Sequence, residues 1–136
     1  MSPESFELAK IWSAKAQSDL ATARLLIKGQ ERYLDTGSYH CQQAVEKAIK
    51  AWLTALEVSF VKTHSLEILL RLCIPSEPGF HRFLSHALEL TPLATEFRYP
   101  GDVFEPSAEE ADNALARAEE LTGWIADEFA KLPPPV

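Results

Sequence analysis

Apolar residues recur every three or four positions through most of this 136-residue chain, and that helical period most constrains its fold. Half-buried strands would alternate apolar and polar residues instead. Glycine, which weakens helices, occurs only five times. The sequence therefore predicts an all-α fold, an antiparallel up-and-down helical bundle of about five helices, three long and two short.

Three long helices are predicted, at residues 3–28, 36–56 and 107–131. Gly29 ends the first of them. Asp35 or Thr36 caps the second, and Ser107 with Glu110 forms a capping box that opens the last. These start and stop signals place the long helices at the two ends and in the middle of the chain.

Two short helices are predicted between the second and the last long helix, over residues 65–73, capped by Thr63, and over residues 80–90. Residues 91–106 hold three prolines and Gly101, so we expect turn and loop there, with one helical turn around residues 93–97. Residues 132–136 form a Pro-rich tail. We expect residues 1–136 to be a single domain.

Composition excludes several classes of protein. No run approaches the roughly 18 consecutive apolar residues of a membrane span, and the first ten residues lack the signal-peptide order, so we expect a cytoplasmic protein without a membrane contact. Cys41 and Cys73 lie outside any CxxC pair, and Cys41 falls on an apolar helix face, where an inert core thiol is expected. We expect no metal site and no cofactor.

The net charge of −7 lies in residues 105–128, which carry eight carboxylates against one arginine. Binding to nucleic acid over a broad surface depends on Lys and Arg neutralising phosphates, so this chain is not expected to have an extended nucleic-acid surface. The final helix is expected to present a solvated face or to meet a basic partner.

A polar stripe follows the central helix when its residues are placed at 100° steps; its members are His40, Gln43, Lys47, Lys50 and Thr54. His40 and Lys47 could donate to an anion, and Gln43 could bind a polar edge. An ordinary solvated helix face would look the same, and both interpretations stay open. If Lys47 is exposed, Lys47→Ala should change the free energy of unfolding by no more than about 0.5 kcal/mol.

Asp19 lies within the apolar stripe of the first helix, where an unpaired carboxylate is costly. This favours a structural partner over a catalytic role, and Arg98 in the segment FRYPGD is one candidate. Arg98 could instead bind an anion beside a stacking Tyr99. His64 follows the predicted cap Thr63 at the N-terminus of the third helix, where the helix dipole favours an anion.

Arg82 and His86 lie four residues apart on the predicted short helix and could act together on one face, but a surface pair is the favoured interpretation.

Three segments in this order resemble the HEPN domain, which is named for its occurrence in higher eukaryotes and prokaryotes and for nucleotide binding: YHCQQAVEKAIKAWL (39–53), THSLEILL (63–70) and LTPLATEFRYPGD (90–102). The W-x-x-x-A-x-x-D-L pattern at residues 12–20 and the Ala-rich final helix also fit. The resemblance covers residues 6–129. It implies a helical bundle that dimerises and is often encoded beside a minimal nucleotidyltransferase, in toxin–antitoxin-like pairs.

Many HEPN proteins are metal-independent RNases with an Arg followed, after four to six residues, by a His. Counted from Arg98, those positions hold Val103, Phe104 and Glu105, so the RNase motif is missing or displaced here. The resemblance therefore favours a non-catalytic HEPN protein. An RNase with a displaced motif and a purely structural dimerisation module remain as alternatives.

The expected ligand is a nucleotide, and the expected protein partners are a second copy of the chain and a nucleotidyltransferase. By resemblance, the nucleotide pocket would be lined by His40, Gln43, Lys47, His64, Arg98 and Tyr99.

Overall fold

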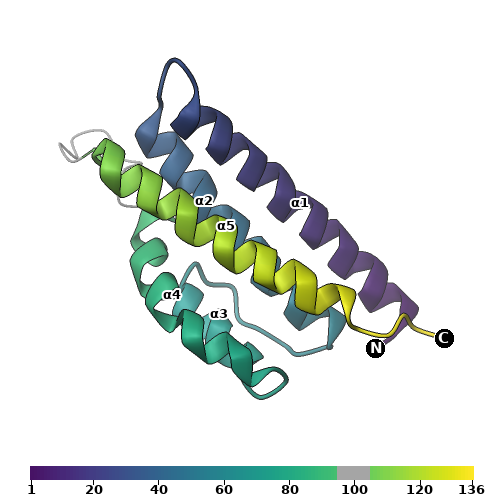
Figure 1. Ribbon diagram of the computed structural model, residues 1–136. Helices are drawn as coiled ribbons and strands as arrows, with labels where there is room; N and C mark the ends of the chain where they lie inside the picture. Colours follow the sequence, from purple (N-terminus) through teal and green to yellow (C-terminus); the bar gives the residue numbers. More distant parts are fainter. Residues whose placement is uncertain (95–104) are drawn as a thin grey trace.

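The computed structural model describes residues 1–94 and 105–136, and within these ranges all regular structure is helical (Figure 1). The α-helices are α1 (Pro3–Lys28), α2 (Leu34–Ala55), α3 (Leu66–Cys73), α4 (Leu84–Leu90) and α5 (Ala108–Ala130). Two 3₁₀ segments, η1 (Pro78–Phe83) and η2 (Thr91–Ala94), flank α4. The predicted all-α bundle with three long and two short α-helices is confirmed.

The long helices α1, α2 and α5 run side by side, and α3 and α4 cover the other side of α2 and α5 (Figure 1). α2 is central because it contacts α1, α3, α5 and η2. The start of α1 meets the end of α5, where the rings of Phe6 and Phe129 stack with centroids 5.8 Å apart. Both ends of the chain therefore lie at the same end of the bundle (Figure 1).

The hydrophobic core surrounds α2, in which most side chains are buried. An aromatic group closes one side of it: Phe80 packs against Trp52 at 5.5 Å and against Trp124 at 4.8 Å between ring centroids. Gly79 lets this group close, because a Cβ there would lie 2.7 Å from the Trp124 ring. In the described part of the chain, no helix has both the length and the apolar character needed to cross a membrane.

The start of α2 differs from the prediction. The helix begins at Leu34, and Asp35 does not cap it but accepts from the Thr36 amide within the first turn, at 2.8 Å. Tertiary contact sets this boundary: the Tyr33 amide donates to the Leu26 carbonyl at 2.8 Å, which closes a tight turn from α1. Asp35 and Thr36 as caps were therefore wrong, because the turn, not a side chain, determines where α2 starts.

The short helices also differ in detail. Ser65, not Thr63, caps α3, because the Ser65 hydroxyl accepts from the Ile68 amide while Thr63 accepts from the Ser65 amide. The predicted helix over residues 80–90 is divided into η1 and α4. A 3₁₀ segment has three residues per turn, so Phe80 and Phe83 share one buried face.

The predicted helical turn around residues 93–97 is represented by η2, which begins two residues earlier, and residues 95–97 lie outside the described ranges. The predicted capping box of Ser107 and Glu110 opens α5 as expected.

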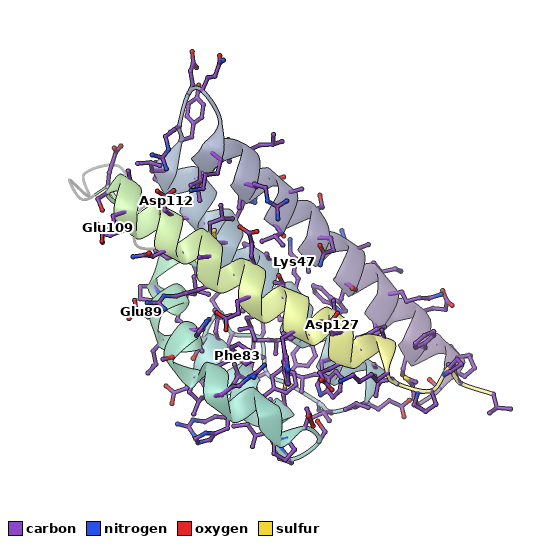
Figure 2. All side chains as sticks on the ribbon, in the orientation of Figure 1. Lys47, Phe83, Glu89, Glu109, Asp112 and Asp127 are labelled. Carbon is purple, nitrogen blue, oxygen red and sulfur yellow. The ribbon has the colours of Figure 1, made fainter. Side chains whose placement is uncertain are left out.

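Acidic residues are distributed along α5, as Glu109, Asp112 and Asp127 show in Figure 2. Part of this charge meets basic side chains of the same chain. Asp112 lies 2.9 Å from Lys28 and 2.7 Å from Arg32, and the hydrogen bond from Lys28 and the positive charge of Arg32 lower the pKa of Asp112. These pairs are exposed, so they orient α5 against the α1–α2 turn more than they stabilise the fold.

Candidate functional site

Asp19 of α1 is the centre of a polar cluster between α1 and α2. Asp19 is 9% exposed, and both of its carboxylate oxygens are paired: Oδ1 lies 2.8 Å from His40 Nδ1, and Oδ2 accepts from Lys47 Nζ at 2.6 Å. The expectation of a structural partner for Asp19 is therefore confirmed. The partners belong to the polar stripe of α2, and Figure 2 shows Lys47 beside α1.

The Asp19 cluster holds two nitrogen donors in place while leaving each with free capacity. Because Nδ1 of His40 faces the carboxylate, Nε2 is the ring nitrogen left for another partner. Lys47 uses one of its three ammonium protons in the contact with Asp19. The edge of the His40 ring is further fixed by Tyr39, whose ring centroid lies 5.4 Å away. This arrangement can bind an anion without first ordering the side chains.

Glu46 is the centre of a second polar cluster, on the side of α2 that meets residues 57–65. It is only 4% exposed. Its Oε1 lies 2.9 Å from His64 Nδ1 and accepts from Gln42 Nε2 at 3.1 Å, and its Oε2 accepts from Lys50 Nζ at 3.0 Å. Burial on its own raises the pKa of Glu46, but the hydrogen bonds from His64, Lys50 and Gln42 outweigh burial and hold the pKa below its ordinary value.

The Glu46 cluster fastens the segment after α2 to the helix. Gln42 Nε2 also donates to the backbone carbonyl of His64 at 3.2 Å, so His64 is held through both its ring and its backbone. Gln43 Nε2 in turn donates to Gln42 Oε1 at 2.7 Å. The position of His64 therefore depends on a chain of side-chain hydrogen bonds that begins inside α2.

Lys50 is enclosed on two sides by aromatic rings. Its Nζ lies 5.5 Å from the ring centroid of Trp12 in α1 and 5.8 Å from that of Phe60 in the segment after α2. Cation–π contacts of this kind stabilise a partly desolvated ammonium group. Together with Glu46 they hold Lys50 within the structure, so Lys50 is less available to a ligand than Lys47.

The predicted site residues thus fall into two neighbouring groups. His40 and Lys47 meet at Asp19, whereas Gln43 and His64 belong to the network around Glu46. Arg98 and Tyr99 lie outside the described residues.

Sequence reasoning missed Glu46 and Gln42 as parts of the site. Their signal was the spacing of Gln42, Glu46 and Lys50, four residues apart, which places them on one face of a helix. Each cluster has the same composition, a buried carboxylate that holds one histidine through Nδ1 and one lysine. In each cluster the charge of the lysine balances the charge of the carboxylate.

The predicted surface pair of Arg82 and His86 is wrong. The Arg82 guanidinium lies over the rings of Phe83 and Trp124, at 4.6 and 5.2 Å, and His86 Nε2 lies 3.2 Å from Glu120. Cation–π contacts with rings on η1 and α5 hold the Arg82 guanidinium, while His86 has its own partner on α5.

Cys41 and Cys73 are buried, as the sequence indicated for Cys41. Burial raises the pKa of the Cys41 thiol to about 12, and it raises the pKa of Cys73 as well, so both thiols are unreactive near neutral pH.

Lys47→Ala is expected to lower the free energy of unfolding by about 1–3 kcal/mol, because it removes one of the two partners described above for the buried Asp19 carboxylate and leaves His40. The expectation of about 0.5 kcal/mol or less applies to an exposed lysine, and Lys47 is largely covered. Urea denaturation measures the difference. Lys10→Ala is the matched control: Lys10 is exposed and pairs with Glu7 at 2.8 Å, so its loss should cost less than about 0.5 kcal/mol. Equal effects of the two variants would contradict this account.

Comparison with known proteins agrees with this architecture. The family profile described as HEPN domain matches residues 9–128. The crystal structure of an archaeal HEPN homologue is similar to this chain, with a TM-score of 0.69 and 26% sequence identity over 89% of this chain and 97% of the other. Among curated proteins, no sequence gives a significant match. Because the family profile spans most of the chain, from the second turn of α1 into the last turn of α5, this chain belongs to the HEPN domain family.

Proposed function

We propose that this HEPN protein binds the phosphate groups of a nucleotide at the polar face of α2. The observation that carries the proposal is the fixed position of His40 and Lys47, which a buried carboxylate holds side by side with donor capacity left over. Gln43 and His64 lie on the adjoining network and could contact the sugar or the base. The protein acts in this proposal as a binding domain and not as an enzyme.

The charge balance of the two clusters bears on how the site would hold a phosphate. Asp19 and Glu46 offset the charges of Lys47 and Lys50, so in this proposal the phosphate is held by directed hydrogen bonds from His40 and Lys47 more than by net charge.

Titration calorimetry with ATP, GTP and their mono- and diphosphates tests this proposal. We expect saturable binding that is at least tenfold weaker in Lys47→Met. Circular dichroism checks that the variant is folded under the conditions used. Lys131→Met, which removes an exposed lysine after α5, should bind as the wild type does. Absence of saturation at millimolar nucleotide, or equal affinity in both variants, would overturn the proposal.

The same preparations separate this function from the alternatives. Cleavage of RNA in the presence of a chelator, lost in Arg98→Ala, would favour the RNase. A protein that binds no nucleotide and cleaves no RNA would favour the structural module.

A nucleotidyltransferase partner is the second part of the proposal, and it rests on the resemblance of the segments at residues 39–53, 63–70 and 90–102. Mixing this chain with a minimal nucleotidyltransferase encoded beside it should give one complex in size-exclusion chromatography. Separate elution of the two proteins at micromolar concentration would contradict this part, and it would leave the nucleotide measurement unaffected.

A further inference from the structure

We propose that Trp12 and Phe60 form the base-binding end of the nucleotide site, where their rings stack on the base while His40 and Lys47 hold the phosphates. This inference rests on the proposed function, because it assigns a place to the base of the same nucleotide. The two rings come from different segments, Trp12 from α1 and Phe60 from the segment after α2, and both are partly exposed.

Trp12 and Asp19 lie on the same face of α1. They are seven residues apart, so Trp12 faces α2 two helical turns, or about 10 Å, along the axis from the Asp19 cluster. α2 follows this order in reverse: Lys47 contacts Asp19 at 2.6 Å, and Lys50, one turn later, lies against Trp12. The phosphate donors and the two rings therefore follow one another along the boundary between α1 and α2 (Figure 1).

The distance between these two ends fits a nucleoside diphosphate bound along α2. With its terminal phosphate at His40 and Lys47, such a ligand is long enough to bring its base to Trp12, two helical turns away. A ligand that consists of phosphates alone reaches only the first end. The aromatic end therefore distinguishes a nucleotide from other phosphate compounds.

Lys50 keeps the two rings close together. Its Nζ lies 5.5 Å from the ring centroid of Trp12 and 5.8 Å from that of Phe60, and Glu46 holds the ammonium group at 3.0 Å. One ammonium group thus positions an aromatic ring on each of two segments before a ligand binds. A base can stack on rings held in this way without first ordering them, which favours binding.

Most of the other aromatic rings in residues 1–94 and 105–136 pack against one another: Phe6 with Phe129, and Trp52, Phe80, Phe83 and Trp124 as one group. Tyr39 is the competing candidate for the base, because it lies beside the phosphate donors. Its ring meets the His40 ring edge-on, at an angle of 71°, and so serves to fix His40. Trp12 and Phe60 are therefore the better place for a base.

Calorimetric titration of the full chain with ADP and with inorganic pyrophosphate tests this assignment, because both ligands have two phosphates but only ADP has a base. Trp12→Leu and Phe60→Leu keep an apolar side chain, and each should weaken ADP binding about tenfold while leaving pyrophosphate binding unchanged. Trp12→Phe keeps a ring and should retain more of the affinity for ADP. Circular dichroism checks that each variant is folded.

Phe6→Leu is the matched control. Phe6 also lies on α1 with a lysine over its ring, Lys10 at 5.3 Å, but it stacks on Phe129 at the end of the bundle. This variant should bind ADP and pyrophosphate as the wild type does.

The outcomes separate this inference from the proposed function. Unchanged ADP binding in Trp12→Leu and Phe60→Leu, beside pyrophosphate binding that requires Lys47, would overturn the inference and leave the phosphate site standing. An equal loss of both ligands in these variants would also overturn it, since the rings would then support the fold and not the base. A loss of ADP binding confined to Tyr39→Leu would place the base at the other end. A wild type that binds neither ligand would remove the proposed function and this inference together.

A fluorescent base reports the stacking directly. The emission of etheno-ADP falls when its base stacks on an indole ring, so we expect quenching on binding to the wild type and to Phe6→Leu. The quenching should be largely lost in Trp12→Leu at saturating protein. Quenching of equal extent in Trp12→Leu would contradict the contact between the base and Trp12.

Discussion

Trp52→Ala is expected to lower the free energy of unfolding by about 3–5 kcal/mol. Trp52 is 3% exposed in the last turn of α2, and its ring packs against Phe80. Its removal leaves a cavity beside Phe80, which also supports Trp124, and the helical backbone cannot collapse far enough to fill that cavity. Urea denaturation of the wild type and the variant gives the difference.

Two further variants separate the contributions of Trp52. Its Nε1 donates to the Ser76 hydroxyl at 2.9 Å, so Trp52→Phe removes this bond while keeping a ring, and it should cost clearly less than the alanine. Ser76→Ala keeps the tryptophan ring but removes the acceptor, together with the bond that the Ser76 hydroxyl donates to the Cys73 carbonyl at 2.9 Å, and should cost about 1 kcal/mol. If Trp52→Ala costs no more than Ser76→Ala, the packing of the aromatic group does not stabilise the fold as described.

Glu46→Gln is expected to lower the free energy of unfolding by about 2–4 kcal/mol, although the two side chains have nearly the same shape. The carboxylate is buried, and Lys50, which is also largely buried, would lose the negative charge that offsets it. The hydrogen bond from His64 would weaken as well, so the segment after α2 should open more readily. Hydrogen exchange of residues 57–65 would detect that opening.

The stabilisation that the Glu46 carboxylate gives the fold should decrease at low pH. The pKa of Glu46 in the folded protein lies below its ordinary value, so the ionised carboxylate stabilises the fold at pH values above about 4.3, the usual pKa of glutamate. This stabilisation is lost as the pH falls through the lower pKa of the folded state. The difference in stability between wild type and Glu46→Gln should therefore narrow below about pH 4.3.

Glu67→Gln is the matched control for Glu46→Gln. Glu67 also pairs with a basic residue four positions later, Arg71, at 3.0 Å, but this pair lies on the surface. Its loss should cost less than about 0.5 kcal/mol at neutral pH. A loss as large as that of Glu46→Gln, or a Glu46 effect that stays constant down to pH 3, would contradict the account of a buried carboxylate.

Much of the fold followed from local sequence signals. The last residue of α1 and the start of α5 could be predicted because Gly29 and the capping box of Ser107 and Glu110 act within one turn of the chain. The start of α2 was missed because a tight turn sets it: Gly37 packs so closely on α1 that a Cβ would lie 2.5 Å from Ile27 Cγ1. Close packing between two helices cannot be predicted from the sequence pattern within either one.

The sequence predicted several residues of the candidate site, but it did not predict that they divide between the Asp19 cluster and the Glu46 cluster. The helical period placed His40 and Lys47 on one stripe, and the cost of burial required a partner for Asp19. The contact of Asp19 with His40 and Lys47 depends on how α1 is aligned with α2. The spacing of residues within one helix does not predict that alignment. Glu46 was missed for a related reason. It lies at the boundary between the solvent-facing and the apolar face of α2, where the sequence pattern is consistent with either a buried or an exposed side chain.

The stacking of Phe6 on Phe129 has a practical consequence for protein engineering. Because the chain begins and ends at the same end of the bundle, a short linker could join the two ends and the polypeptide could be reopened at the turn between α1 and α2 (Figure 1). Such a circular permutant would keep every helix while moving the new ends to the opposite pole. Fluorescent labels attached there would lie as far as the bundle allows from labels at the original ends.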